Sequence, residues 1–352
     1  MRVLVTGHAG YIGSVMVPIL LEAGHEVTGL DTHLYDSCTF GSNGTAVPEI
    51  VTDIRDVELE DLAGFDAVIH LAALSNDPLG DLNPELTYEI NHRAAVRLGE
   101  LAKKAGVKRF LMSSSCSTYG ASGDDLIDES AEFRPVTPYG ESKVWAERDL
   151  SKLADENFSP VFLRSSTAYG VSPRLRFDLV LNNLTAWAYA TGRVYLKSDG
   201  TPWRPIVHIE DISRTFLAAL EAPRELVHNQ AFNVGSSAEN YQISELADIV
   251  VRLVPDAHVD YAPGAGPDKR CYRVSCDKLE RQLGFRTRWT AEAGVRELLE
   301  AFQRTQISPD EFEGTRYKRV AHIKKLLESG ELDPALRWRT PVKGGEYVQS
   351  YN

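Results

Sequence analysis

The chain has 352 residues, of which 25% are charged and 43% hydrophobic, and this size suits one large α/β domain or a nucleotide-binding domain with a smaller substrate domain. Its net charge of −12 argues against nucleic acid or an anionic membrane as a partner, so an anionic substrate would need a local cluster of arginines. We also expect no membrane span and no signal peptide, and cysteines without metal spacing (Cys38, Cys116, Cys271, Cys276) favour a reduced cytoplasmic protein without zinc or structural disulfides.

Residues 2–13 read RVLVTGHAGYIG and predict a buried parallel strand that turns directly into a helix over Tyr11 to Ala23. Gly7, Gly10 and Gly13 are spaced three apart in the turn. Gly7 permits a tight turn, Gly10 lets a phosphate approach the backbone, and Gly13 lets the helix pack closely on the sheet. The free N–H groups and positive dipole end of such a helix favour a diphosphate.

A second strand is expected at Glu26 to Leu30, and Asp31 follows it directly. A carboxylate about twenty residues beyond the glycines can accept hydrogen bonds from an adenosine ribose. Because it would repel a 2′-phosphate, Asp31 predicts NAD over NADP, although His33 nearby softens the preference. Alternatively, the glycines are ordinary turn residues and Asp31 caps a loop. The order of strand, glycines, helix, second strand and Asp favours a dinucleotide site.

Strands alternate with helices as far as Leu163, which predicts an α/β fold with a doubly wound parallel sheet of the Rossmann type. We expect an NAD-binding domain at 1–165 with interleaved later segments, a substrate domain at 166–305 and a helical C-terminal extension at 306–352. Further strands are expected at Glu49–Val51, Ala67–His70, Arg109–Met112, Val161–Leu163, Arg193–Leu196, Ile206–His208 and Ala231–Val234, and further helices at Glu85–Ala105, Tyr139–Glu156, Asp211–Glu221 and Ile243–Leu253.

The tail from Ser308 onward is charged and partly helical. Tyr317 to Ser329 carries Val320, Ile323, Leu326 and Leu327 as an amphipathic stripe. We assign this stripe packing and no chemistry.

In a doubly wound sheet, ligands bind beyond the carboxyl ends of the strands, so the residues that follow each strand are candidates for the cofactor. Asp53 could accept from an adenine amino group or serve as a turn residue, and the small Ala72 and Ala73 could let the cofactor lie against backbone or simply permit tight packing. The full set of expected cofactor residues is Gly7, Gly10, Tyr11, Ile12, Gly13, Asp31, Asp53, Ile54, Leu71, Ala72, Ala73, Asn91, Ser113, Tyr139 and Lys143.

Tyr139 and Lys143 are four residues apart, which places them on one face of a helix. A phenol with an ordinary pKa near 10 is a poor base, but an adjacent ammonium and a cationic nicotinamide would stabilise its phenolate. Tyr139 could then exchange a hydroxyl proton, while Ser115, after the preceding strand, holds the reacting oxygen. Such a pair alone could be a surface pair; downstream of a dinucleotide fingerprint it favours catalysis.

These residues carry a resemblance to the extended short-chain dehydrogenase/reductase family, specifically its nucleotide-sugar epimerases and dehydratases. The similarity covers roughly residues 1 to 285 and rests on TGHAGYIG, Asp31, Asp53-Ile54, HLAA at 70–73, Asn91, SSSCSTYG at 113–120, PYGESK at 138–143, LRSSTAYG from Leu163, RPIVHIED from Arg204, FNVG from Phe232 and KLERQLGF from Lys278. The resemblance implies a tightly held NAD, a nucleoside-diphosphate sugar substrate and chemistry that begins by oxidation at a sugar carbon, usually C4.

Within this family, 4,6-dehydratases usually read Thr-Asp-Glu where this chain has Ser115, Cys116 and Ser117. Cys116 and Ser117 supply neither the general acid nor the base that eliminating water requires, so the resemblance favours a 4-epimerase with a transient 4-keto sugar. An NAD(P)H-dependent 4-ketosugar reductase, which uses the same Ser, Tyr and Lys, is the alternative. A dinucleotide sensor would not need Tyr139 and Lys143, and Arg204 argues against a steroid or phenol reductase.

The expected substrate contacts are Ser75, Asn76, Ser115, Cys116, Ser117, Thr167, Arg176, Asn183, Arg204 and Arg270. Arg204 is the best diphosphate ligand, with a surface arginine as the alternative. Arg176 and Asn183 could instead serve as helix caps, and Ser75 and Asn76 could be an ordinary polar loop. The chain departs from the family at Thr167, where an asparagine is usual, and at Ala265, where an arginine is expected; Arg270 could replace that charge.

His208 is expected to be structural, because a lone histidine on a strand is more often a core residue than a ligand. The helices Glu85–Ala105 and Tyr139–Glu156 match those that the family pairs in a four-helix interface, which implies a homodimer. The same helix faces could instead only cover the sheet.

Overall fold

The computed structural model describes residues 1–264, 266 and 270–340. Within this part of the chain, seven parallel strands form the central sheet, with β4 in its middle and β1 between β4 and β2. In order across the sheet they are β11 (Gln230–Val234), β7 (Ser159–Ser165), β5 (Arg109–Ser115), β4 (Ala67–His70), β1 (Arg2–Thr6), β2 (Glu26–Asp31) and β3 (Glu49–Val51). The order reverses between β1 and β4, where ligands bind in a doubly wound sheet. The predicted α/β fold is confirmed.

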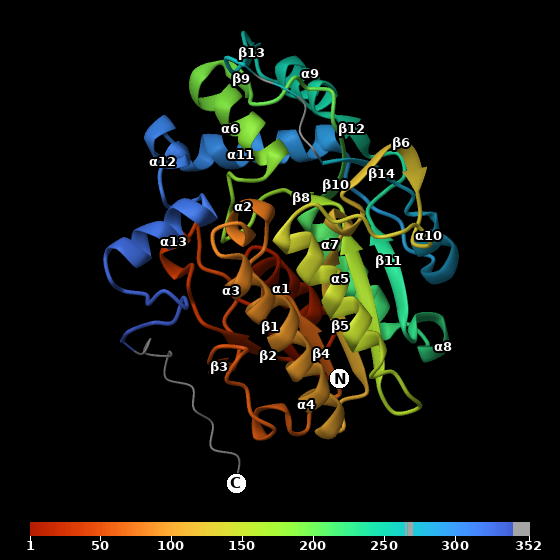
Figure 1. Cartoon of the computed structure of the whole chain (residues 1–352). Coiled ribbons are helices and arrows are strands. Elements are labelled where there is room, and N and C mark those ends of the chain that lie inside the picture. Colours follow the sequence, from red (N-terminus) through yellow and green to blue (C-terminus); the bar gives the residue numbers. More distant parts are fainter. Residues whose placement is uncertain (265, 267–269, 341–352) are drawn as a thin grey trace.

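Helices cover both faces of the sheet because its strands are apolar on both sides (Figure 1). Val3 and Val5 pack under the first group of helices, and Leu4 faces the second. The first group is α1 (Gly13–Glu22), α7 (Ile209–Glu221), α8 (Arg224–Val227) and α10 (Asp277–Leu283). The second is α2 (Asp77–Gly80), α3 (Pro84–Tyr88), the π-helix η3 (Glu89–Ala94), α4 (Ala95–Lys104) and α5 (Pro138–Ser151).

A smaller, mostly later part of the chain lies above the carboxyl ends of the strands (Figure 1). Its apolar core is shared by α6, α9 and α11 with their neighbouring strands. Its elements are β6 (Ala121–Ile127), β8 (Thr167–Tyr169), α6 (Val180–Thr191), β9 (Arg193–Leu196), β10 (Trp203–His208), β12 (Asn240–Gln242), α9 (Ile243–Leu253), β13 (His258–Tyr261), β14 (Cys271–Val274) and α11 (Ala291–Thr305). Short 3-10 turns occur at Asp36–Cys38, Glu60–Leu62 and Cys116–Tyr119.

The tail continues through α12 (Pro309–Glu313) and α13 (Arg319–Glu328). The predicted apolar stripe is confirmed in part: Ile323 and Leu326 are buried in the core under the second group of helices, and Val320 and Leu327 pack against that core half-buried. In Figure 1, α13 lies beside α2, at one side of the sheet. The described part of the extension, residues 306–340, therefore packs against the rest of the fold.

The expected helix at Glu85–Ala105 is not continuous, because a π-helical turn at η3 divides it into α3 and α4. The extra residue per turn brings Asn91 inward, where its side chain bonds the backbone of Leu74. Helix α5 starts at Pro138, where the Thr137 hydroxyl accepts a hydrogen bond from Gly140 N at 3.2 Å, and it ends earlier than expected, at Ser151.

Among the residues that the structure describes, no helix combines the length and hydropathy that a membrane crossing requires. The same residues include no group of three His, Cys, Asp or Glu side chains placed to hold a metal ion.

Candidate active site

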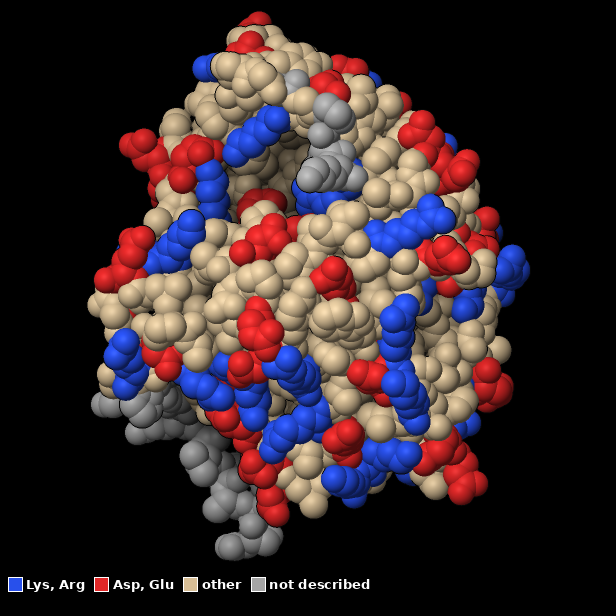
Figure 2. All heavy atoms as spheres, in the orientation of Figure 1, with Lys and Arg blue, Asp and Glu red and all other residues tan. Residues whose placement is uncertain are grey.

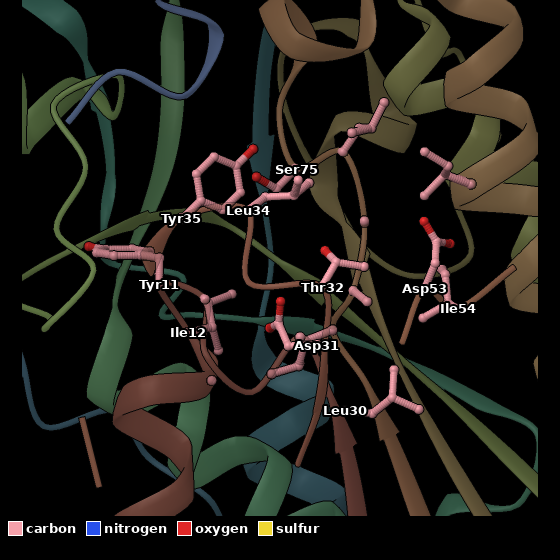
Figure 3. Close-up of a pocket in the computed structure, with 18 of the residues that line it drawn as sticks. Tyr11, Ile12, Leu30, Asp31, Thr32, Leu34, Tyr35, Asp53, Ile54 and Ser75 are labelled. Atoms are coloured by element: carbon pink, nitrogen blue, oxygen red, sulfur yellow. The ribbon is translucent and has the colours of Figure 1, made fainter. Parts of the chain in front are cut away.

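A pocket with about 950 Å³ of empty space, part of it open to solvent, lies at the carboxyl ends of β1, β2 and β4 (Figure 3). Its size fits a dinucleotide or another large ligand. Of the expected cofactor residues, those that line it are Gly7, Gly10, Tyr11, Ile12, Gly13, Asp31, Asp53, Ile54, Leu71, Ala72 and Ala73. The sequence therefore located this pocket from residues spread over the first four strands.

The glycine turn lies so close to neighbouring backbone atoms that a side chain at Gly7 or Gly13 would clash with them. Gly7 has φ +74°, and a Cβ there would lie 2.8 Å from Ala72 N. A Cβ on Gly13 would lie 2.4 Å from the Gly7 carbonyl oxygen, so this glycine permits the helix to start against the turn. No side chain caps the start of α1 at Ile12, so its positive dipole end is open to an anion, while Ser14 N and Val15 N already donate to the Gly10 and Ile12 carbonyls. This cradle fits the diphosphate of a dinucleotide.

Asp31 is fixed at the end of β2 by backbone donors. One carboxylate oxygen accepts from Ala9 N at 3.1 Å, and the other accepts from His33 N at 2.9 Å. The His33 ring donates to Asp36, and this hydrogen bond raises the pKa of His33 to about 9 despite partial burial. His33 is also 3.1 Å from Glu49, so two carboxylates balance its charge. Asp31 lines the pocket, and the positive charge of His33 beside it is paired with other carboxylates.

The opposite end of the pocket from Tyr11 is lined by Asp53 and Ile54 (Figure 3). Both Asp53 carboxylate oxygens accept from the Arg55 guanidinium, at 2.9 and 2.6 Å. Burial alone would raise the pKa of Asp53, but these hydrogen bonds outweigh burial and lower it. Asp53 is therefore an ionised acceptor at this end of the pocket.

Ser115, Tyr139 and Lys143 come together beside the pocket, as the sequence predicts. Ser115 ends β5; its hydroxyl accepts from Ser117 N at 3.1 Å and lies near enough to Tyr139 to lower the pKa of that phenol. Tyr139 lies in the first turn of α5. One turn later Lys143, only 2% exposed, donates from Nζ to the Ser113 carbonyl at 2.8 Å, and its Nζ is 5.9 Å from the Tyr139 ring centroid.

The sequence predicts that Lys143 lowers the pKa of Tyr139, but in this structure burial has the largest effect on that pKa. Burial raises the pKa of Tyr139 above its usual range, and the hydrogen bond with Ser115 and the charge of Arg176 only partly offset it. Burial also lowers the pKa of Lys143 to about 8, although Glu147 opposes that shift. The chain alone therefore keeps Tyr139 protonated, so the positive charge of an oxidised nicotinamide would be needed to favour its phenolate.

Arg176 links the pocket to the catalytic residues, because it lines the pocket and its charge acts on Tyr139. Its guanidinium holds both oxygens of Asp178, at 2.8 and 3.0 Å, and donates to the Ser75 hydroxyl at 3.0 Å. Asn76 donates to the same Asp178 carboxylate at 2.7 Å. These expected substrate residues form one polar group at the junction of the two halves of the molecule.

A hollow separates the part of the molecule with α6 and α9 from the part with the sheet, and Lys and Arg side chains border it (Figure 2). Arg270 pairs with Asp77 at 2.5 Å, and the charge of Asp77 also raises the pKa of Tyr139. Arg204 is buried, donates to the Trp203 carbonyl at 2.8 Å and also bonds the Arg270 carbonyl. Both arginines are thus held near one another; Ala265 lies outside the described residues.

Other expected residues lie elsewhere. Cys116 is fully buried, and its thiol donates to the Arg164 carbonyl, so the structure does not bring it to the pocket. Asn91 holds the loop after β4 at Leu74 and does not line the pocket. Asn183 donates to the Phe177 carbonyl, and Thr167 lies in β8. Ser117 contacts the site through Ser115.

His208 is structural, as expected: it stacks on Trp289 with ring centroids 3.9 Å apart and bonds Glu297 at 2.9 Å.

Sequence reasoning missed several residues that line the pocket, above all Tyr35, Arg319 and Leu336. Tyr35 follows Asp31 closely, so the loop position could have indicated it. Nothing in the sequence marks Arg319, because it precedes an amphipathic stripe and looks like one more surface charge.

Residues 3–235 match the model of the NAD dependent epimerase/dehydratase family. The chain belongs to this family. It is 32% identical to a UDP-glucose 4-epimerase of Streptococcus mutans over 312 residues, covering 81% of this chain and 92% of the relative. It is 29% identical over 329 residues to a UDP-glucose 4-epimerase of Bacillus subtilis, covering 85% and 94%.

Two solved structures are similar to this chain in fold. MoeE5 in complex with UDP-glucose and NAD is 28% identical, with a TM-score of 0.75 over 87% of this chain and 100% of that one. The UDP-glucose 4-epimerase of Thermotoga maritima with UDP-glucose is 26% identical, also with a TM-score of 0.75, over 87% and 100%. The predictions of an enzyme of this family and of NAD as its cofactor are confirmed. Both neighbours match over their whole length, so about an eighth of this chain lies outside the matched part.

Proposed function

We propose that this protein is a nucleotide-sugar epimerase that inverts C4 of its sugar through a transient 4-keto intermediate, with Tyr139 as the proton-exchanging residue. The observation that carries the proposal is that Ser115, at the end of β5, lies near enough to Tyr139 to lower its pKa, with Lys143 one turn further along α5 and the NAD pocket alongside. The relatives at about 30% identity, named UDP-glucose 4-epimerase, support the same reaction and make UDP-sugars the first substrates to test.

NAD, when bound, would accept a hydride from the sugar and return it, so the reaction needs no added reductant. The chain would hold it with the glycine turn, Asp31, the Asp53 end of the pocket and Ala72–Ala73. Residues of the chain transfer the proton: Tyr139 takes it from the sugar hydroxyl and returns it, while Ser115 orients the hydroxyl oxygen. Lys143 orients α5 against Ser113 and supplies positive charge one turn from Tyr139.

A dehydratase is disfavoured by the chemistry beside Ser115. Burial raises the pKa of the Cys116 thiol to about 12, and Ser117 has no acidic group. Neither residue can deliver or remove a proton at neutral pH, as the elimination of water demands. The site therefore has proton-transfer groups for an oxidation and its reversal, while Cys116 and Ser117 add no acid for loss of water.

We further propose that the nucleotide sugar occupies the hollow beyond the pocket. Ser75, Asn76, Arg176, Arg204 and Arg270 would contact its sugar and diphosphate, because guanidinium groups bind phosphate oxygens with two parallel hydrogen bonds. Binding would require Arg270 to release Asp77 or to share it with the substrate. Ser117, Thr167 and Asn183 remain proposed contacts of the sugar or nucleotide.

A homodimer is proposed from the surface formed by α4 and α5. Trp145 in α5 is 37% exposed and packs on Tyr88 with ring centroids 4.7 Å apart. An exposed tryptophan on a pair of long helices favours association with a second copy of the chain.

The test is proton NMR of UDP-, dTDP-, CDP- and GDP-sugars incubated with the purified protein and no added cofactor. The expected result is formation of the C4 epimer in one nucleotide series. A protein that acts only when NAD(P)H is supplied would contradict the epimerase and indicate the 4-ketosugar reductase.

A further inference from the structure

The C-terminal strap, defined as residues 307–340, reaches three loops that border the cofactor pocket. It contributes Arg319 and Leu336 to the pocket lining. Its contacts with the loops after β2, β3 and β8 are Trp338 Nε1 to Thr32 O at 2.6 Å, His322 Nε2 to Leu34 O at 2.9 Å, Arg337 Nη2 to Asp56 Oδ1 at 3.0 Å, Phe177 N to Tyr317 O at 3.0 Å and Arg319 Nη2 to Arg174 O at 2.8 Å. A segment fixed on three loops around a pocket can influence how its ligand enters and leaves.

Arg319 is the unusual residue of the strap. It is 2% exposed although it is an arginine at the first turn of a surface helix. Its guanidinium lies over the Tyr35 ring, with 4.1 Å between Cζ and the centroid. Its Nη1 is buried and has no hydrogen-bond partner among the residues that the structure describes. A buried guanidinium nitrogen without an acceptor is costly unless a ligand supplies one.

The charges around Arg319 leave room for an anion. Arg55 and Arg176 also line the pocket, but Arg55 is paired with Asp53 and Glu89, and Asp178 pairs with Arg176 through both carboxylate oxygens. No described carboxylate forms an ion pair with Arg319. Burial and the charge of Arg176 together lower the pKa of Arg319, which shows that the neighbouring cation is near enough to matter. The two buried guanidinium groups of Arg176 and Arg319 thus have only the carboxylate of Asp178 beside them, and an anionic ligand would neutralise the remaining positive charge.

The position of these cations indicates which part of the cofactor they face. The Arg176 guanidinium lies 6.0 Å from the Tyr11 ring centroid, and Tyr11 belongs to the glycine turn that cradles a diphosphate. Tyr35, which Arg319 covers, lies toward Tyr11 and Ser75, whereas Asp53 and Ile54 line the far end (Figure 3). Arg319 is therefore close to the diphosphate region and remote from the end expected to hold adenine.

We propose that Arg319 binds the diphosphate of NAD, and that the C-terminal strap thereby holds the cofactor in place. A guanidinium can donate to phosphate oxygens bidentately, and the buried Nη1 would gain its missing acceptor. This inference rests on NAD as the family's cofactor and is independent of the sugar or the reaction at C4. The strap then explains how an enzyme that oxidises and reduces its substrate in one turnover keeps its cofactor throughout.

The test compares Arg319→Gln with Lys324→Gln, which removes the same charge from an exposed position on the same helix. The full-length protein is loaded with isotopically labelled NAD, and its release is followed in excess unlabelled NAD. We expect Arg319→Gln to release NAD roughly 10- to 100-fold faster, because a charge-assisted hydrogen bond is lost. Arg319→Lys should be intermediate, and Lys324→Gln should match the unmodified protein. Unchanged release from Arg319→Gln would refute the proposal.

A second measurement separates a diphosphate ligand from a general loosening of the strap. Competition by ADP-ribose and by adenosine is measured for Arg319→Gln and for Trp338→Phe, which removes the indole donor to Thr32 and leaves Arg319 in place. Selective weakening of ADP-ribose in Arg319→Gln supports direct binding of the diphosphate. Equal weakening of both competitors, in both variants, would overturn direct binding. Because the readout is cofactor binding, failure of the proposed epimerisation would leave either result intact.

Discussion

At the residue scale, the role proposed for Tyr139 as a base conflicts with surroundings that disfavour a phenolate. Burial raises the pKa of Tyr139, whereas the partly opposing effects come from Ser115 and Arg176. The chain thus holds the proton on Tyr139 until oxidised cofactor is beside it. In the proposed reaction, such an arrangement would link removal of the sugar proton to the presence of oxidised NAD.

Replacing Tyr139 with Phe should lower kcat by about 10²- to 10⁴-fold, because general acid–base catalysis is lost. The NAD content of the purified variant should equal that of the unmodified protein, since the tyrosine hydroxyl is outside the pocket lining. Turnover is measured by NMR, and bound NAD by release after denaturation. Tyr88→Phe removes a phenol from a partly exposed tyrosine and serves as the control. Unchanged turnover in Tyr139→Phe would refute the catalytic assignment.

Lys143 makes the reaction sensitive to alkaline pH. Burial lowers its pKa to about 8, so its positive charge is present below pH 8 and is lost as the pH rises through that value. We expect kcat/KM to fall on the alkaline side, with a midpoint near 8. In Lys143→Arg, whose charge persists above pH 12, this alkaline fall should disappear even if the maximum rate is lower. A fall with the same midpoint in both proteins would show that another group titrates.

Asp31 should determine which dinucleotide is bound. In Asp31→Ser the ribose loses a charged acceptor and a 2′-phosphate meets no carboxylate, so binding of NAD should weaken roughly 10- to 100-fold and the preference for NAD over NADP should shrink by at least about tenfold. Asp36→Ser is the matched control, because Asp36 pairs with His33 and does not line the pocket. Affinities are measured by calorimetry, and an unchanged preference would contradict the role of Asp31.

His33 should make the stability of the fold depend on pH. Its pKa in the folded protein is about 9, above its ordinary value near 6.5, so its contribution is complete below pH 6.5 and is lost as the pH rises through 9. Partial exposure limits this contribution to about 1–3 kcal/mol. In urea unfolding between pH 6 and 9, the difference between the unmodified protein and His33→Asn should shrink; asparagine suits the φ of +57°. Parallel profiles would contradict this.

At the scale of elements, the sequence predicted the central strands well because each is a short apolar run followed by a polar turn. It also placed the glycine turn, Asp31 and the Ser115, Tyr139 and Lys143 group, since these depend on local spacing. Strand β6, ASGDDLI, was missed because it pairs with β14 near the surface and shows no apolar alternation. Arg319 was missed because a charge becomes buried only through contacts far away in the sequence, with Tyr35 and Arg174.

The hydrogen bonds of Asn91 in the π-helical turn η3 should contribute to the stability of the fold. Asn91 binds both backbone groups of Leu74, at 2.8 and 3.0 Å, and donates to Ser142 at 3.2 Å. Asn91→Ala would leave buried polar groups without partners and should lower the free energy of unfolding by about 2–4 kcal/mol. It should also weaken NAD binding, because the loop it holds lines the pocket. Asn157→Ala, at an exposed position, should change neither property. An Asn91→Ala protein with normal stability would show that the π-turn does not depend on this side chain.

At the scale of the whole molecule, the cofactor pocket is assembled from both ends of the chain. Gly7 to Gly13 form one wall, and Arg319 and Leu336 form part of another. The aromatic cluster of Phe177, Phe302, Phe312 and Tyr317 packs the start of the strap against the later half of the molecule. Folding of the tail and completion of the pocket are therefore coupled, which ties cofactor retention to the fold as a whole.

The proposed homodimer can be tested at Trp145. Trp145→Glu places a charge on α5 beside Tyr88 of α3 and His92 of η3, where its burial in an interface would be costly. We expect this variant to be monomeric by light scattering after size-exclusion chromatography, with its NAD pocket intact, because Trp145 is absent from the pocket lining. Leu21→Glu is the matched control, since Leu21 on α1 has the same exposed fraction, 37%, on the opposite face of the sheet. If Trp145→Glu stayed dimeric, α5 would not be the interface and its exposed tryptophan would need another partner.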